Sequence, residues 1–390
     1  MEKKIKVRSI IFTEACPLAC RYCDLKNGPV FGQSPAMTKE QIFALVEKFN
    51  QLDDYNQIDT RILFTGGEPL LYWDWIKEII EKYGHRFQYM FNTSGYLFTE
   101  EMLEFLSHYT VNFVLSVDGN EKLTNYLRPV CNSITKTGYF KQLKEIIPTL
   151  LFYFPQTPFR IIIGPRYADT LYEMYIEATR LGFKYFTFLL DFESRPGRII
   201  PKDKKIIYWD EKYTKILKEQ MDLILEDIIQ GYMQGIARPR VTDLDKAIKF
   251  LLNKEPFNPD NLPCQVFNER TLNTLYNPEI SNNCFSGCFS CLDDVKIELM
   301  NAYNNHSHIC DKDPQCQAFE FCALICCPQN SYTQRSGFFD FDDLECVVNK
   351  ISYYGAIKLL SICNELCPNA KLYHQYINSF IYPGKEEVWL

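Results

Sequence analysis

The hydrophobic period alternates along the first half of the chain, and this alternation limits the possible fold most strongly. Short continuous apolar runs, typical of strands buried on both faces, alternate with longer stretches that have the spacing of amphipathic helices. The expected strands lie within 6–13, 61–66, 87–95, 111–119, 159–165 and 183–191. The clearest helix-like stretches are 38–52, 72–84, 170–182 and 211–235. This order predicts an α/β fold with a parallel sheet covered by helices.

Six such strands fit either a doubly wound sheet or a partial barrel. Both architectures bring the loops at the carboxyl ends of the strands to one edge, where ligands bind. Several polar residues of this chain follow the expected strand ends directly, so we expect its chemistry at that edge.

Composition excludes some classes of function. The chain has 390 residues, a formal net charge of −7 and 16 cysteines. The mild charge argues against a nucleic-acid partner. No apolar run is long enough to cross a membrane, and the N-terminus resembles a first strand more than a signal peptide. The predicted location is the cytoplasm. In that reducing compartment, 16 cysteines are expected to serve as metal ligands or catalytic groups rather than in disulfides.

The cysteines divide the chain into two functional regions. Three lie near the start, Cys131 stands alone, and twelve fall between Cys264 and Cys367. We expect the cysteine-dense region to need metal to hold its shape. The predicted segments are a barrel domain over 1–240, a linker over 241–263, a small cysteine-rich domain over 264–350 and a C-terminal helical segment over 351–390, with a helix at 351–367.

Cys16, Cys20 and Cys23 follow the first expected strand, and Tyr22 precedes the third cysteine. Three thiolates can hold three irons of a cubane [4Fe–4S] cluster and leave the fourth iron open. A zinc site would normally need a fourth protein ligand, and none lies at short spacing. A zinc knuckle is the alternative interpretation.

The C-x3-C-x2-C spacing with an aromatic residue before the last cysteine resembles the signature of the radical SAM superfamily. The resemblance implies a partial (β/α)6 TIM-like barrel and a cluster whose open iron binds S-adenosylmethionine (SAM). An electron from the cluster then splits the sulfonium of SAM and yields a 5′-deoxyadenosyl radical. An external reductant such as flavodoxin or ferredoxin is also implied.

A glycine-rich turn, "FTGGEPLL", ends the second expected strand. Gly66 and Gly67 allow backbone to approach a ligand closely, and Glu68 offers a carboxylate to an ammonium group. The turn resembles the family's motif for the amine of SAM. An ordinary turn with an exposed acid is the alternative.

Further candidates for SAM binding follow the later strands. By resemblance, Ser116 and Asp118 are candidates for the ribose and the carboxylate of SAM, with Asn92 on the same rim. Arg128 is a candidate for that carboxylate or for a substrate acid, and Gly164 for the place beside adenine. Each is alternatively a polar or turn residue that only ends a strand.

Cys131 lies just past Arg128 and could face the active site. A thiol there could donate a hydrogen atom to a substrate radical or act as an acid. A free buried cysteine is the alternative.

The C-terminal cysteines resemble the SPASM extension of radical SAM enzymes, which reads C-x2-C-x5-C-x3-C followed by a distant cysteine. That extension carries two auxiliary [4Fe–4S] clusters. Asp313 replaces the first cysteine of the pattern, so either Asp313 or Cys310 is expected as the last ligand of the outer cluster. The other implied ligands of that cluster are Cys316, Cys322 and Cys346.

The resemblance assigns Cys264, Cys284 and Cys326 to the inner cluster. Its fourth ligand is Cys288 or Cys291, and the spacing does not distinguish them. A second departure from the family is Glu279, which replaces a usual glycine. The alternative is a structural module stapled by zinc.

Together these motifs predict a radical SAM/SPASM enzyme that abstracts hydrogen from a peptide or protein side chain. We favour a ribosomal-peptide maturase that forms a C–C or thioether cross-link. Because only fifteen residues precede Cys16, a leader peptide is expected to bind elsewhere or to a separate recognition protein.

Three alternatives stay open. In anaerobic sulfatase maturases an aspartate follows the second inner-cluster cysteine, whereas Phe285 follows Cys284 here, which argues against that reaction. A small-molecule oxidising enzyme is the second alternative. A non-catalytic, zinc-stapled binding protein is the third, and the intact N-terminal motifs disfavour it.

Overall fold

Seven strands form a single parallel sheet. The computed structural model describes residues 4–13, 15–23, 38–56, 58–131, 138–190, 207, 209–253, 292–305, 315–325, 343–367 and 370–381. The sheet order is β1-β2-β3-β4-β5-β6-β7, and each neighbouring pair is parallel. The strands are β1 (Lys4–Ile11), β2 (Ile58–Thr65), β3 (Gln88–Thr93), β4 (Val111–Ser116), β5 (Phe159–Ile163), β6 (Tyr185–Leu190) and β7 (Arg240–Val241). The predicted α/β fold is confirmed, and all six expected strands are present.

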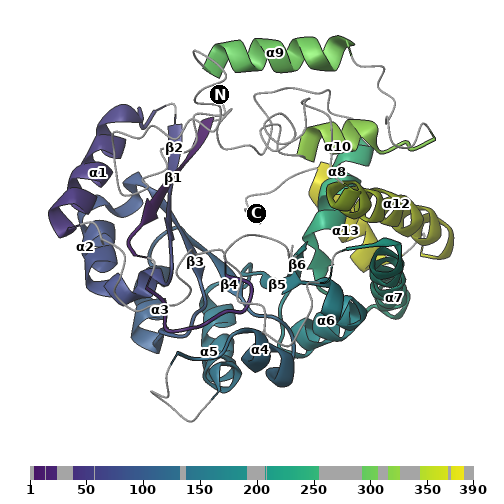
Figure 1. The fold of residues 1–390 in the computed structure, drawn as a ribbon, viewed down its shortest axis with the longest axis horizontal. Helices are drawn as coiled ribbons and strands as arrows, with labels where there is room; N and C mark the ends of the chain where they lie inside the picture. The colour runs from purple at the N-terminus through teal and green to yellow at the C-terminus, as the bar shows by residue number, and fades with distance from the viewer. Residues whose placement is uncertain are drawn as a thin grey trace.

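Helices connect the strands and lie outside the curved sheet, so the sheet is a partial barrel (Figure 1). The connecting helices are α1 (Lys39–Leu52), α2 (Trp73–Tyr83), α3 (Glu100–Ser107), α4 (Glu121–Leu127), α5 (Tyr139–Tyr153), α6 (Leu171–Arg180) and α7 (Glu211–Gln234). Short 3-10 turns are η1 (Pro69–Tyr72), η2 (Gly84–Arg86) and η3 (Pro165–Thr170). Among the described residues after β7, the helices are α8 (Thr242–Asn253), α9 (Leu292–Asn305), α10 (Phe319–Ile325), α12 (Asp343–Leu366) and α13 (Lys371–Ile381).

Local sequence explains where the predicted helices begin and end. Thr38 and Gln41 form a capping box at α1, because the hydroxyl of Thr38 accepts from the backbone of Gln41 and the Gln41 side chain accepts from the backbone of Thr38. Asp210 caps α7, and Gly235 ends it in a left-handed conformation with φ 69°.

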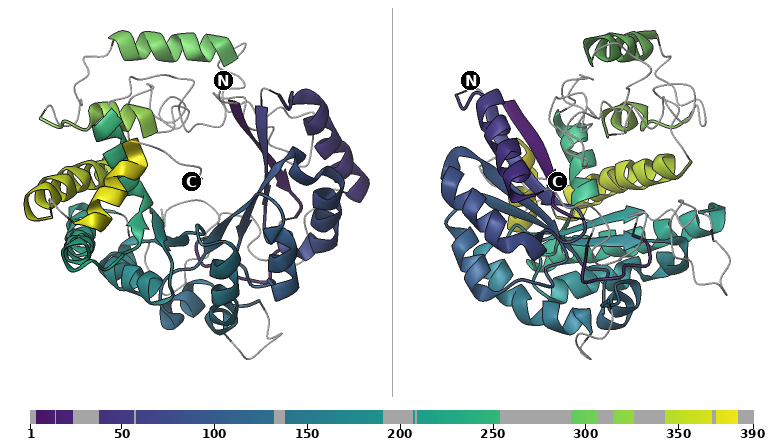
Figure 2. Two further views of the ribbon diagram at one scale, coloured as in Figure 1. Left: turned by 180° about the vertical axis from the view of Figure 1, so that it is seen from behind. Right: turned by 60° about the vertical axis from the view of Figure 1, so that its left-hand side comes forward.

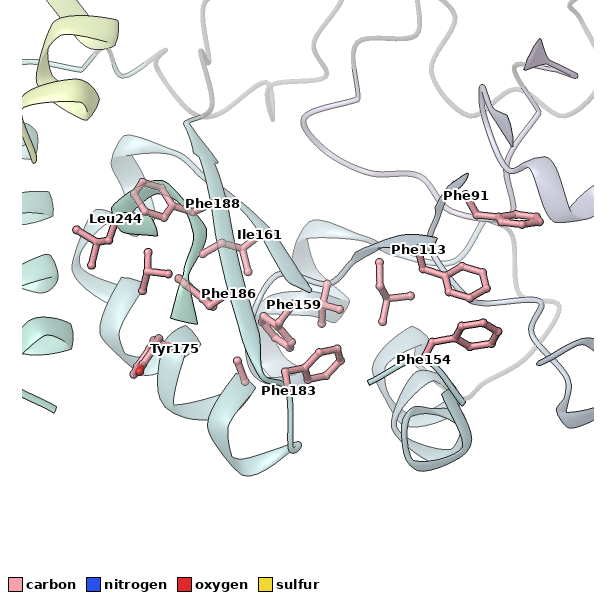
Figure 3. Close-up of a cluster of buried hydrophobic side chains, with 14 of the residues drawn as sticks. Phe91, Phe113, Phe154, Phe159, Ile161, Tyr175, Phe183, Phe186, Phe188 and Leu244 are labelled. Atoms are coloured by element: carbon pink, nitrogen blue, oxygen red, sulfur yellow. The ribbon is translucent and has the colours of Figure 1, made fainter. Parts of the chain in front are cut away.

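The core lies between the sheet and its outer helices. In β5, Phe159, Ile161 and Ile163 have no exposed surface, whereas Arg160 and Ile162 are half-buried. Phe159 packs against Phe183 with a centroid distance of 5.1 Å (Figure 3). Burying one such aromatic side chain contributes about 1.5–3 kcal/mol. The alternation therefore puts one face of β5 against helices and the other toward the barrel interior.

β7 and α13 were not predicted from sequence, and neither were α3, α4, α5, α8, α9 and α10. β7 has only two residues, too few for a hydrophobic period to be recognised. The helix expected at 351–367 begins earlier, as α12, and a second helix, α13, follows it. Pro368 lies just beyond α12, and proline disfavours helical backbone in the residue before it.

Helix α8 lies within the segment that the sequence predicted as a linker, 241–263. Its residues Leu244, Ala247 and Ile248 are buried, so this part of the segment belongs to the packed body. The boundaries of the cysteine-rich domain remain predictions.

The C-terminal helices pack beside α7 and α8 at the β6–β7 side of the sheet (Figure 2). Lys358 on α12 forms an ion pair with Asp222 on α7, with a distance of 2.7 Å. Tyr376 on α13 donates a hydrogen bond of 2.6 Å to Asp245 on α8. Among the described helices, none combines the length and apolar character that a bilayer crossing requires.

Candidate active site

The three N-terminal cysteines lie on the loop that follows β1, which we call the cysteine loop (residues 15–23). A segment more than a hundred residues later, 127–131, pairs with this loop through an antiparallel bridge between Leu18 and Val130. The backbone bonds that hold the two segments are Ala19 N to Pro129 O at 2.7 Å, Arg21 N to Leu127 O at 2.9 Å and Cys131 N to Pro17 O at 2.8 Å. The loop is therefore fixed by tertiary contacts, in addition to its own sequence.

The glycine-rich turn after β2 approaches the cysteine loop closely. Gly66 has φ 123°, and a Cβ atom there would lie 2.4 Å from the carbonyl oxygen of Thr13. The next two residues bind the same stretch of backbone, since Gly67 N donates to Thr13 O at 2.7 Å and Glu68 N donates to Ala15 O at 2.9 Å. Glycine is required at position 66 both for the backbone conformation and for the close approach.

Glu68 is fully buried, and its carboxylate faces the end of β3. One oxygen accepts from Thr93 Oγ1 at 2.6 Å and from Leu70 N at 3.2 Å. The other oxygen accepts from the backbone N and the Oγ of Ser94, at 3.0 and 2.5 Å. Burial raises the pKa of Glu68, while the bonds from Ser94 and Thr93 oppose that shift. Glu68 thus ties the turn after β2 to the end of β3.

Asp118 and Arg128 form a buried ion pair beside the cysteine loop. Arg128 Nε donates to Asp118 Oδ2 at 2.7 Å, and Nη2 donates to Oδ1 at 3.4 Å. Asp118 also accepts from the hydroxyl of Tyr22 and, at 3.1 Å, from the backbone N of Ile162. Arg128 stacks over the ring of Tyr22 at 5.1 Å and donates from Nη1 to Cys20 Sγ at 3.6 Å. One network therefore connects β4, β5 and the cysteine loop.

The donor set suits an iron–sulfur cluster. Burial raises the pKa of Cys20 to about 12, with Arg128 opposing, and it raises the pKa of Cys16 further. Thiolates at these positions therefore need a cationic partner, which cluster irons provide. Within the described ranges, no three His, Cys, Asp or Glu side chains converge on a point where one metal ion could sit. A cubane cluster places each thiolate on a different iron.

The other predicted residues of the barrel lie around the same edge. Ser116 ends β4, Asn92 is exposed near the end of β3, and Gly164 lies between β5 and η3 as the N-cap residue of η3. Cys131 is buried, and its thiol lies 3.8 Å from the carbonyl oxygen of Cys16, so it is beside the cysteine loop. Burial raises the pKa of the Cys131 thiol.

Tyr139 is a member of this region that sequence reasoning missed. Its hydroxyl oxygen lies 2.5 and 2.7 Å from the carbonyl oxygens of Ser94 and Ser116, so its single hydrogen can be donated to either of them, between the ends of β3 and β4. Nothing in the sequence distinguishes it from the other tyrosines of the helices, because its role depends on where α5 crosses the sheet.

The predicted auxiliary ligands are only partly described. Cys316 is half-buried and accepts a hydrogen bond from the hydroxyl of Tyr354 at 3.8 Å. Cys322 is buried on α10, and Cys346 is half-buried on α12. The remaining predicted ligands, Cys264, Cys284, Cys288, Cys291, Cys310, Asp313 and Cys326, lie outside the described residues.

Residues 10–177 match the family model of the radical SAM superfamily. The matched segment contains the cysteine loop, the glycine-rich turn and the Asp118–Arg128 pair. Residues 10–177 are therefore a radical SAM domain.

Two curated relatives match parts of the chain. The radical SAM cyclopropyl synthase TigE of Paramaledivibacter caminithermalis is 26% identical over 149 residues, which cover 35% of this chain and 32% of the relative. The 7-carboxy-7-deazaguanine synthase of Methanocaldococcus jannaschii is 34% identical over 113 residues, which cover 27% of this chain and 46% of the relative. The chain thus spans less than half the length of either relative.

Two solved structures share the fold. The structure titled native anSMEcpe with bound AdoMet has a TM-score of 0.64 and 17% identity, and the match covers 93% of this chain and 100% of that one. Streptococcus suis SuiB bound to S-adenosylmethionine has a TM-score of 0.52 and 15% identity, covering 88% and 77%. At these identities the likeness establishes the fold alone.

Proposed function

We propose that this enzyme holds a [4Fe–4S] cluster through Cys16, Cys20 and Cys23 and cleaves SAM reductively. The observation that carries the proposal is the position of the three thiols on one loop, between the glycine-rich turn and the Asp118–Arg128 pair. When bound, the cluster supplies one electron to the sulfonium of SAM, and the resulting 5′-deoxyadenosyl radical abstracts a hydrogen atom from the substrate.

The chain's own residues would hold and orient these groups. Gly66 lets the turn lie against the backbone before the cysteine loop, and Arg128 supplies positive charge beside Cys20. Cys131 remains a proposed hydrogen-atom donor or acid. The proposed contacts of SAM are Tyr22, Gly66, Gly67, Glu68, Asn92, Ser116, Asp118, Arg128 and Gly164.

The test is release of 5′-deoxyadenosine from SAM by the anaerobically reconstituted protein with dithionite. We expect the wild-type protein to release it and the triple variant Cys16→Ala/Cys20→Ala/Cys23→Ala to release none. Cys363→Ala, which removes a buried thiol of α12, is the matched control and should retain the activity. Full activity in the triple variant would end the proposal.

We infer that the substrate is a peptide or protein side chain and that the product is a C–C or thioether cross-link. A structure with this fold, native anSMEcpe with bound AdoMet and Cp18Cys peptide, supports a peptide substrate. The proposal includes two auxiliary clusters in a SPASM-like domain, an external reductant such as flavodoxin or ferredoxin, and a separate leader-recognition protein.

Mass spectrometry can test the substrate class. Each short peptide encoded beside this gene would be expressed alone, with the wild-type enzyme and with the triple cysteine variant. A loss of two hydrogens that needs the wild-type enzyme is expected for a cross-link. A peptide whose mass is unchanged in all three samples would count against that peptide as substrate.

A small-molecule substrate is the second candidate. The similarity to 7-carboxy-7-deazaguanine synthase favours a small-molecule substrate, since this relative is more nearly identical to the chain in its matched segment, at 34%, than the cyclopropyl synthase is, at 26%. If no neighbouring peptide changes mass while SAM cleavage is intact, this candidate becomes the stronger one.

A further inference from the structure

The guanidinium of Arg128 uses separate nitrogens for its two partners. Nε and Nη2 donate to the carboxylate of Asp118, at 2.7 and 3.4 Å. Nη1, the remaining nitrogen, donates to Cys20 Sγ at 3.6 Å. The ion pair with Asp118 already neutralises Arg128, so the bond to a predicted cluster ligand needs a separate explanation.

Several contacts fix this guanidinium in place. Arg128 is 6% exposed, and Asp118 is fully buried. The carboxylate of Asp118 also accepts from the hydroxyl of Tyr22 and, at 3.1 Å, from the backbone N of Ile162. The guanidinium carbon of Arg128 lies 5.1 Å from the centroid of the Tyr22 ring. The carboxylate and the ring therefore hold the N–H of Nη1 in its direction toward Cys20.

A second thiol of the cysteine loop also accepts an N–H group. The backbone N of Leu18 donates to Cys16 Sγ at 3.5 Å. Hydrogen bonds to the sulfurs of an iron–sulfur cluster influence its reduction potential, because they stabilise the negative charge that reduction adds. Any residue except proline would supply the backbone donor of Leu18. The donor to Cys20 is a side chain, so its effect can be tested by substitution.

We propose that Arg128, by donating a hydrogen bond to Cys20, raises the reduction potential of the [4Fe–4S] cluster at the cysteine loop, which we call the N-terminal cluster. The proposal rests on the proposed function, which gives Cys20 an iron to bind. A reductant of the flavodoxin or ferredoxin class loses one electron, and the cluster with its three thiolates gains it as one negative charge. The N–H group of Arg128 at Cys20 stabilises that added charge.

The first experiment measures the potential by EPR-monitored redox titration of the anaerobically reconstituted enzyme without SAM. The signal of the N-terminal cluster is the component that the triple variant Cys16→Ala/Cys20→Ala/Cys23→Ala lacks. Arg128→Lys keeps a positive charge beside Asp118 but loses the planar fork that serves two partners at once. We expect it to favour the oxidised cluster by a factor of about three to ten, and tenfold corresponds to a fall of about 59 mV for one electron.

Arg21→Lys is the matched control. Arg21 is next to Cys20 in sequence and carries the same charge, but its Nε donates to the carbonyl oxygen of Tyr126 at 2.7 Å. Its guanidinium stacks over the Tyr126 ring at 4.3 Å. The same substitution at this position should leave the potential unchanged. An equal shift in both variants would overturn the proposal, because the hydrogen bond to Cys20 would then not be the cause.

The second experiment detects the hydrogen bond in the wild-type enzyme and so does not depend on the folding of a variant. The protein is produced with arginine labelled with nitrogen-15 in its guanidino group, and pulsed EPR records the hyperfine couplings of the reduced enzyme. We expect a nitrogen-15 coupling on the signal of the N-terminal cluster. Arg128→Lys should lose this coupling, and Arg21→Lys should keep it.

The proposal is overturned if folded Arg128→Lys keeps the wild-type potential, or if the wild-type signal carries no nitrogen-15 coupling. Failure of the proposed function is distinguishable from both results. The wild-type enzyme would then lack the EPR signal that depends on Cys16, Cys20 and Cys23 and would release no 5′-deoxyadenosine, and the present proposal would be overturned with it.

Discussion

At the scale of single residues, the site depends on a few positions that accept only one type of residue. Gly66 is the clearest, because its positive φ and the nearby oxygen of Thr13 both exclude a Cβ atom. The sequence motif indicated this glycine, but the oxygen that crowds it comes from the end of another strand. Sequence therefore identified the residue, and the structure supplied the contact that requires it.

Gly66→Ala should destabilise the protein and reduce SAM cleavage. The strained backbone alone costs about 1–3 kcal/mol, and displacement of the Thr13 carbonyl adds to that cost. Urea unfolding and 5′-deoxyadenosine release measure the two effects. Gly235→Ala is the control, because Gly235 also has a positive φ but has no neighbouring atom within 4 Å. Equal losses in both variants would contradict the role of the close approach.

Arg128→Gln should destabilise the fold by about 3–5 kcal/mol, because the buried carboxylate of Asp118 loses its ion-pair partner. The double variant Arg128→Gln/Asp118→Asn should lose less than the sum of the two single losses, since neither charge is then left alone. Unfolding free energies of the four proteins form the test. Additive losses would mean that the pair is not coupled.

At the scale of elements, the cysteine loop and the C-terminal helices are both held by segments distant in sequence. The loop pairs with 127–131, and α13 is fixed to α8 by Tyr376 and Asp245. Arg240 of β7 joins the second contact through its own ion pair with Asp245 at 2.7 Å. These contacts hold the cysteine loop beside residues 127–131 and α13 beside α8.

Tyr376→Phe should lower the unfolding free energy by about 1.5–3 kcal/mol, because a hydrogen bond to the largely buried carboxylate of Asp245 is lost. Limited proteolysis should also release α13 earlier than in the wild-type protein. Tyr213→Phe is the control, since the hydroxyl of Tyr213 forms no hydrogen bond within the described residues. If both variants behave alike, the contact does not anchor α13.

At the scale of the whole molecule, the sheet brings motifs from the ends of five strands, β1 to β5, to one edge. The alternation of apolar runs and helices was enough to predict the six long strands, because each strand is buried on at least one face by its neighbouring helix. It did not predict β7 or α13. Each of these depends on contacts between elements, which no local period records.

Iron analysis of anaerobically reconstituted protein tests the proposed cluster content. Three cubane clusters correspond to about twelve irons per chain, and loss of Cys16, Cys20 and Cys23 should remove about four of them. Asp313→Ala should in addition change the spectrum of the outer cluster if its carboxylate is a ligand; an unchanged spectrum would favour Cys310. About four irons in the wild-type protein would contradict the two auxiliary clusters.

The sequence by itself determined the parallel α/β class of the fold and the location of the cysteine loop, because hydrophobic period and ligand spacing are local properties of the chain. Only the tertiary structure decided which charged groups neutralise one another. Asp118 and Arg128, which are both predicted to contact a ligand, form a buried ion pair with each other. The physical reason is that charge pairing depends on the positions of strand ends in space, which follow from sheet register and helix packing.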